Sequence, residues 1–298
     1  MSEVTRASSL IKQIRLVVTV KSYPQPSSRY HESVCVAGIR TDTSDPEWVR
    51  LYPVQFRDLP EEKQFPKWSE IELDVSDSSS DNRLESLRPI ESSIEVVRKI
   101  GTSANWAERM QLLEPLLVGS MCDVVRQQQA TGASLAAFRP HSVSSVEVKA
   151  ERSPDWSESD RNALAQCNLW AQDKRILEKI PLRWSYRYSC GPDCSGHRQK
   201  IIDWEIGEAW RQWRRRYGPT KTADLVGEHW MTLASAPKDP VFLVGNLRRW
   251  TNVFLVLGVC YPRKDPLRDL DGLQGRLDFA SHLGDDLTVT RHGESLDT

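Results

Sequence analysis

The chain has 298 residues, 39% of them hydrophobic, with 40 basic and 41 acidic side chains and a formal net charge of −1. These values are typical of a globular protein with one large or two smaller domains, and they exclude a histone-like polycation. No stretch approaches the ~18 to 20 apolar residues that a membrane-spanning helix needs. The first ten residues lack the apolar segment of a secretory signal, so we expect a cytoplasmic protein without a membrane partner.

The N-terminal part has the pattern of a small β structure. Alternating or β-branched segments predict strands at residues 14–20, 33–40, 48–54 and 71–75. Pro24 and Pro26 predict an exposed, extended loop after the first of these strands. Short strands at this spacing are typical of an antiparallel sheet or barrel. We therefore predict a β-rich module over residues 1–92.

Further along the chain the pattern mixes helical and strand periods. Helices are predicted at 105–129, 157–178, 201–217 and 221–234, and strands at 145–149, 183–189, 241–245 and 252–261. Residues 263–298 carry few bulky side chains and an acidic excess, which predicts a flexible tail. The predicted fold class is α+β, with an antiparallel β-rich module, a mixed α/β module over 93–262 and an acidic tail over 263–298.

One short segment has the pattern of a metal site. Tyr188-Ser-Cys-Gly-Pro-Asp-Cys-Ser-Gly-His197 places Cys190, Cys194 and His197 on a turn between a predicted strand and a predicted helix. Short spacing lets thiolates converge on one ion at little entropic cost. Thiolate and imidazole ligands favour zinc, with an iron–sulfur cluster as the alternative. We predict that this Cys/His knuckle holds a metal that links the strand to the following helix.

A structural zinc site needs a fourth ligand. Cys35 and Cys260 are the first candidates, because both lie in predicted strands that folding could bring close. The weaker candidates are Cys122, Cys167, His229 and Asp203. If water takes the fourth position, the site is catalytic instead. The sequence leaves this choice open.

The helix predicted after the knuckle permits two interpretations. Its apolar stripe, early acids and late arginines are explained by packing and by the helix dipole alone. In a functional interpretation, Asp203 and Glu205 near His197 act as metal ligands or as general acid and base. Its arginines, with Trp and Tyr between them, would then contact phosphates and stack on bases.

The predicted loops of the β-rich module add further cations and aromatic residues near strand ends. A β module with such loops could hold an oligonucleotide, and the alternative is a solvated loop surface. The residues predicted to contact nucleic acid are Lys21, Arg50, Arg57, Arg211, Arg214, Arg215, Arg216 and Arg248.

The knuckle belongs to a longer pattern, Cys-x3-Cys-x2-His-x5-Asp-Trp-Glu, followed by Val244-Gly-Asn and by Leu257-Gly-Val. Together with Lys21-Ser-Tyr-Pro and Arg50-Leu-Tyr-Pro-Val-Gln-Phe-Arg, this pattern resembles an uncharacterised family of prokaryotic proteins. The resemblance covers most of residues 15–262. It implies that the motif is one unit, and it supplies no activity.

The P-loop, dinucleotide-binding, nucleophile-elbow and HExxH motifs are absent from the sequence. The leading hypothesis is a metal-containing protein that binds DNA or RNA, in prokaryotic defence or DNA processing. The first alternative is a metal-dependent nuclease or hydrolase that uses His197, Asp203 and Glu205. The second is a scaffold that binds a protein partner through faces rich in its 11 tryptophans. Whether the protein is an enzyme stays open.

Overall fold

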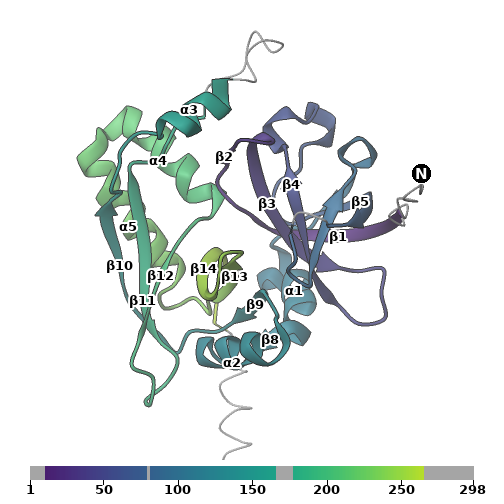
Figure 1. Ribbon diagram of the computed structural model, residues 1–298. Helices are drawn as coiled ribbons and strands as arrows, with labels where there is room; N and C mark the ends of the chain where they lie inside the picture. The colour runs from purple at the N-terminus through teal and green to yellow at the C-terminus, as the bar shows by residue number, and fades with distance from the viewer. Residues whose placement is uncertain (1–10, 79–80, 166–176, 265–298) are drawn as a thin grey trace, which may run out of the picture. The chain divides into compact units, whose positions relative to one another are not determined.

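The computed structural model describes residues 11–78, 81–165 and 177–264 (Figure 1). Within the described chain, the N-terminal strands close into a barrel of five strands in the order β1-β3-β4-β6-β5, with β5 pairing back to β1. Neighbouring strands are antiparallel except for the parallel pair β4–β6. The bounds are β1 Lys12–Lys21, β3 His31–Arg40, β4 Glu47–Val54, β5 Ser69–Asp77 and β6 Ser86–Pro89. Counted along the chain, β4 and β6 are the third and fifth strands of the barrel. This strand order, with the third and fifth strands parallel, is that of the OB fold.

The four strands predicted for this part are confirmed, and the sheet they form is a closed barrel. Alternate apolar residues point inward, and Leu16, Val36, Leu51 and Leu73 pack in a core that is almost fully buried. The 3₁₀ helices η1 (Phe56–Asp58) and η2 (Glu61–Lys63) lie between β4 and β5, and β7 (Glu95–Lys99) pairs with β5.

The predicted exposed loop after β1 is wrong in part. Gln25–Ser27 form the short strand β2, which pairs with β3, and Tyr23 and Pro24 are buried. The reason is tertiary: the backbone N–H of Tyr23 donates to the carbonyl of Ile202, which holds this segment against residues far along the chain.

Gly38 lies opposite Val18 on β1, in close contact with the backbone of that strand. A Cβ atom at this position would lie 2.3 Å from the backbone oxygen of Val17 and 2.9 Å from Cγ of Leu16. We expect Gly38→Ala to lower the free energy of unfolding by ~1 to 3 kcal/mol, because backbone atoms in a barrel cannot move aside cheaply. Denaturant unfolding measures this loss. Gly101→Ala is the control, since its nearest neighbour would be 3.8 Å away, and an equal loss in both variants would contradict the steric argument.

The second part of the structure is a mixture of helices and sheets. One sheet has the order β14-β13-β9-β8 and another the order β10-β11-β12. The strands are β8 Leu117–Val118, β9 Leu135–Phe138, β10 Ser142–Ala150, β11 Leu182–Ser189, β12 His197–Lys200, β13 Val241–Leu247 and β14 Trp250–Cys260. The helices are α1 Ser103–Leu113, α2 Met121–Thr131, α3 Glu158–Ala165, α4 Trp204–Tyr217 and α5 Pro219–Leu233. No helix within the described ranges is long and apolar enough to cross a membrane.

Several predicted bounds are corrected by the structure. The helix predicted over 105–129 is broken into α1, η4 (Glu114–Leu116), the short strand β8 and α2, because Pro115 and Gly119 interrupt it and Ser120 caps a new helix. The helix predicted from residue 201 begins at 204, with Asp203 as its N-cap. The helix predicted over 157–178 is observed as α3, and residues 166–176 lie outside the described part, as do residues 265–298 of the predicted tail.

The barrel and the second part share a core. The outer face of the barrel, with Val17 and Ile39, packs against Leu135, Leu243 and Leu257 of the β14-β13-β9-β8 sheet. Four tryptophans, Trp68, Trp184, Trp210 and Trp230, are buried, whereas Trp250 is 61% exposed. This packing lays the β13–β14 hairpin beside the barrel strands that carry the candidate pocket described below.

Candidate functional site

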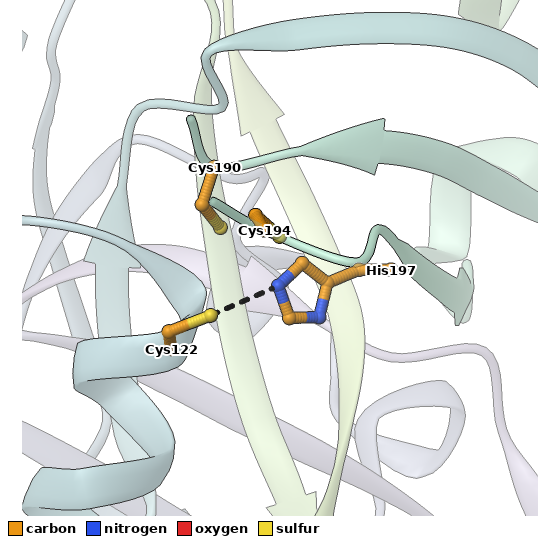
Figure 2. Close-up of side chains that lie close together, drawn as sticks. All are labelled: Cys122, Cys190, Cys194 and His197. Carbon is orange, nitrogen blue, oxygen red and sulfur yellow. Dashed lines mark hydrogen bonds between the residues drawn. The ribbon is translucent and has the colours of Figure 1, made fainter. Parts of the chain in front are cut away.

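Four side chains converge between the β11–β12 turn and α2 (Figure 2). Cys190 and Cys194 lie in the turn, His197 is the first residue of β12, and Cys122 lies in the first turn of α2. Their potential ligand atoms all lie within 4.8 Å of one another. The predicted triad therefore comes together, and Cys122 completes it.

The geometry of the cluster fits a tetrahedral metal ion. Sγ of Cys122 lies 3.5 Å from Nε2 of His197. A zinc ion with bonds of ~2.3 Å to sulfur and ~2.1 Å to nitrogen places these two atoms about 3.6 Å apart. Three thiolates and one imidazole are a common ligand set of structural zinc sites. The cluster could therefore hold a metal ion, and its chemistry is compatible with zinc.

The surroundings of the cluster also suit a metal. The backbone N–H of Met121 donates to Sγ of Cys190 at 3.3 Å, and that of Gly196 donates to Sγ of Cys194 at 3.4 Å. The Tyr188 ring stacks on His197. Burial lowers the pKa of His197, which favours the neutral imidazole that binds metals, and burial raises the pKa of Cys190 to about 11. A bound cation would stabilise the Cys190 thiolate here.

The preferred candidates for the fourth ligand were wrong. Cys35 lies on β3, and its Sγ accepts a hydrogen bond from Arg50 at 3.0 Å. Cys260 is fully buried beside Met110, and Cys167 lies outside the described residues. The cluster links α2, not α4, to the β11–β12 hairpin, because β12 intervenes before α4 begins. The break at Gly119-Ser120, after which α2 begins at Met121 and places Cys122 in its first turn, is the sequence signal that would have favoured Cys122.

Asp203 and Glu205 lie with Lys67 and are not part of the Cys/His cluster. Oδ2 of Asp203 lies 2.7 Å from Nζ of Lys67, and its Oδ1 accepts the backbone N–H of Glu205. Glu205 pairs with the same lysine at 2.9 Å from a side chain that is 61% exposed. Burial raises the pKa of Asp203 to about 6, and Lys67 opposes this rise. The observed contacts make Asp203 the N-cap of α4 and its link to the segment before β5.

Three of the predicted nucleic-acid contacts, Lys21, Arg57 and Arg211, line one hollow together with Phe56 and Trp204. Nζ of Lys21 lies 3.8 Å from the centre of the Phe56 ring, and burial, followed by the charge of Lys67, lowers its pKa to about 8. Arg57 pairs with Glu32, and Arg211 pairs with Glu208. These two arginines are thus already matched by acidic side chains.

The remaining arginines of α4 lie in its last turn. Arg214 pairs with Glu178. Arg215 and Arg216 are exposed, and the guanidinium of Arg216 lies over the Tyr217 ring at 5.3 Å. The end of α4 therefore presents two exposed cations beside an aromatic ring.

Arg50 and Arg248 line a different pocket of about 300 Å³. It lies on β3 and β4 of the barrel, next to the loop that follows β1, and the β13–β14 hairpin forms its other side. These are the strands and the loop that OB-fold proteins use for ligands. Within the described part of the chain, the charged residues of the lining are Arg50, Arg83 and Arg248, with no acidic residue.

The tip of the β13–β14 hairpin extends this surface. Trp250 pairs with Leu247 across the tip and is 61% exposed, and Arg249 beside it is exposed. The sequence analysis missed Arg83, Asn246 and Trp250 as site residues. Their pattern in the sequence is ordinary, and only the packing of the hairpin on the barrel brings them to one place.

Comparison with solved structures found matches at low sequence identity and low TM-score. A murine DNA-binding protein bound to double-stranded DNA is 9% identical, covers 85% of this chain and 97% of its own, and has a TM-score of 0.29. A HINa domain in complex with a 20-base-pair DNA duplex is 7% identical over 86% of this chain and 100% of its own, with a TM-score of 0.32. A replication protein A heterotrimer bound to single-stranded DNA is 11% identical over 95% of this chain and 56% of its own, with a TM-score of 0.34. Likeness at such low TM-scores carries no inference about function.

Among curated proteins, none matches this chain. Two domain families match it in succession. Residues 12–115 match the domain of unknown function DUF8758, and residues 118–277 match the domain of unknown function DUF8757. Since the second match covers more than half of the sequence, the chain belongs to the DUF8757 family.

Proposed function

We propose that this protein is a zinc-containing protein that binds single-stranded nucleic acid, DNA or RNA, along the face where β3 and β4 meet the β13–β14 hairpin. The observation that carries the proposal is the arginine-lined pocket on this face, continued by the exposed Trp250 at the hairpin tip. Proteins that bind single strands combine a cationic groove for the backbone with aromatic side chains on which bases stack. A place in prokaryotic defence or DNA processing is the biological setting of the same proposal.

In this proposal the zinc ion has a structural role. Three cysteines and one histidine would fill a tetrahedral coordination sphere, which would leave no position for a water or a substrate. The ion would hold the β11–β12 hairpin on α2. The same argument disfavours the metal-dependent nuclease, which needs an open coordination position at His197.

The proposal predicts salt-dependent binding of a fluorescently labelled single-stranded oligonucleotide. Affinity should fall steeply as salt rises, because phosphate contacts release counterions. Trp250→Ala removes a stacking surface worth ~1 to 3 kcal/mol per base, so the Kd should rise ~5- to 150-fold. Fluorescence anisotropy across a salt series measures both effects.

The end of α4 supplies the comparison for this experiment. The double variant Arg215→Ala and Arg216→Ala removes two exposed charges from a different element, and it should change the Kd less than Trp250→Ala does. If it weakens binding while Trp250→Ala does not, α4 is the binding surface and the hairpin is not. Absence of binding to any single-stranded DNA or RNA at low salt would refute the proposed function.

A further inference from the structure

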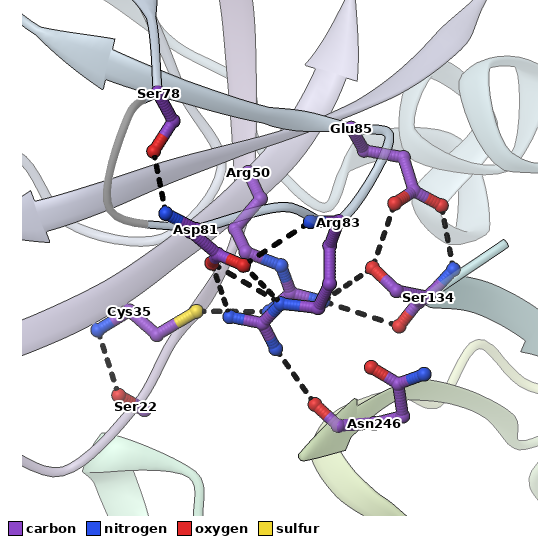
Figure 3. Close-up of polar contacts among 9 residues, drawn as sticks. All are labelled: Ser22, Cys35, Arg50, Ser78, Asp81, Arg83, Glu85, Ser134 and Asn246. Atoms are coloured by element: carbon purple, nitrogen blue, oxygen red, sulfur yellow. Dashed lines mark hydrogen bonds and ion pairs between the residues drawn. The ribbon is translucent and has the colours of Figure 1, made fainter. Parts of the chain in front are cut away.

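The arginine-lined pocket contains a buried guanidinium that has no carboxylate as a direct partner among the described residues. Arg50 is 2% exposed. Its Nη1 donates to Sγ of Cys35 at 3.0 Å, and its Nη2 donates to the carbonyl and the hydroxyl of Ser134 at 3.1 and 3.0 Å (Figure 3). Its buried Nε has no hydrogen-bond partner among the described residues. Burial of a guanidinium without an anionic partner lowers the stability of the fold, unless a bound anion compensates its charge.

The neighbouring Arg83 lines the same pocket, but its charge is balanced by a carboxylate. Its Nε and Nη2 donate to both carboxylate oxygens of Asp81, and its Nη1 donates to the backbone carbonyl of Asn246 at 2.8 Å. The carboxylate of Glu85, by contrast, is linked to the Arg50 guanidinium through Ser134, whose hydroxyl donates to that carboxylate at 2.7 Å and accepts from Nη2 of Arg50. Arg83 therefore fixes the hairpin to the barrel, while Arg50 still lacks a direct anionic partner in the part of the chain that the structure describes.

A second unpartnered atom lies on the hairpin side of the pocket. Asn246 is 4% exposed and its Nδ2 donates to the carbonyl of Thr251, but its buried Oδ1 accepts no hydrogen bond from any described residue. The absence of a side chain at Gly245 brings the hairpin close to Arg50, since a Cβ there would lie 3.4 Å from Nη2 of the arginine. Tyr52, which is half-buried, adds an aromatic ring to the lining.

We propose that this pocket holds one nucleotide unit, with its phosphate at Arg50 and the edge of its base at Oδ1 of Asn246. The lining supplies a cation for the phosphate, an acceptor for an amino or imino N–H of the base, and a ring on which the base can stack. A volume of about 300 Å³ is at the lower end of ligand pockets and suits a single nucleotide. The inference rests on the proposed function for its ligand class, and the nucleotide is either free or part of a strand.

The test uses Cys35, which lines the same pocket and is partly exposed. Iodoacetamide alkylates Cys35, and peptide mass spectrometry measures the rate. The reaction is run in the presence of a nucleoside monophosphate, the matching nucleoside, inorganic phosphate or a short single-stranded oligonucleotide. We expect a monophosphate or the oligonucleotide to slow alkylation at least ~10-fold when saturating, and nucleoside or phosphate alone to be much weaker. Arg50→Gln should abolish this protection.

If Arg50→Gln does not fold, Arg248→Ala at the rim of the pocket replaces it as the test variant. This variant should weaken the protection of Cys35 at a fixed nucleotide concentration. A monophosphate that protects without any strand binding in the anisotropy experiment means a free-nucleotide site, which refutes the proposed function and leaves the pocket assignment standing. Strand binding that leaves Cys35 fully reactive overturns the nucleotide pocket and leaves the proposed function standing. Equal protection by inorganic phosphate alone also overturns it.

Discussion

Cys122→Ser is expected to lower the melting temperature by ~10 °C or more, because it removes one of the four side chains of the Cys/His cluster. Loss of a structural metal belongs to the few single changes that cost ~4 kcal/mol or more. In a protein of this size, each kcal/mol corresponds to ~2 to 4 °C. Scanning calorimetry measures the shift, and elemental analysis of the purified wild-type protein should find about one zinc ion per chain.

The zinc prediction has a matched control within the same chain. Cys35→Ser changes a cysteine on β3 that is not part of the cluster, so it should keep its zinc and most of its thermal stability. Removal of the metal with a chelator should lower the melting temperature of wild type and of Cys35→Ser, but not that of Cys122→Ser. Wild-type protein that holds no metal, or that melts at the same temperature after chelation, would show that the cluster is only a packing arrangement of thiols.

Asp203→Asn is expected to destabilise the protein by ~3 to 5 kcal/mol. The substitution removes the closer and more buried of the two carboxylates that pair with Lys67, whose side chain is 8% exposed, and Glu205, which is 61% exposed, remains. A buried charge whose pairing is weakened in this way is costly. It also weakens the cap of α4. Urea unfolding monitored by tryptophan fluorescence measures the loss.

Glu205→Gln separates this structural role from a catalytic one. Glu205 pairs with the same lysine, but its side chain is 61% exposed, so its loss should cost less than ~1 kcal/mol. A marked difference between the two variants supports the ion pair as a structural link. If Asp203→Asn folds as stably as wild type, the buried pair does not stabilise the fold. That result would favour the interpretation of these carboxylates as a general acid and base.

The local sequence pattern was sufficient to predict most of the strands and the turn that carries Cys190 and Cys194. Alternation of apolar residues identifies β1, β3, β4 and β5, because one face of each strand is buried in the barrel. Cys190, Cys194 and His197 lie within eight residues, so their convergence needs only a tight turn. The broken helix at Pro115 and Gly119 was missed, although its signal is local, because the helical periodicity continues on both sides of the break.

Contacts between distant segments were beyond the reach of local pattern. Cys122 joins a turn that lies about 70 residues further along the chain, where Cys190 and Cys194 are found. Asp203 and Lys67 are 136 residues apart in the sequence, and Arg50 and Ser134 are 84 residues apart. Each pairing depends on how the segments pack against one another in the folded protein. The spacing of residues along the sequence does not predict that packing. The division at residue 92 stays a prediction.

The sequence by itself thus determined the β-rich start, the mixed second part and three of the four metal-ligand candidates, because these depend on periodicity and short spacing. Only the tertiary structure decided which cations have acidic partners and which line a pocket. Lys21, Arg50 and Arg57 look alike as residues near strand ends, yet they end in different surroundings. Folding buries Lys21 over Phe56 and pairs Arg57 with Glu32, whereas Arg50 has no carboxylate in direct contact among the residues that the structure describes. Burial and charge pairing are properties of packed surfaces, and packing brings together residues that the chain keeps far apart.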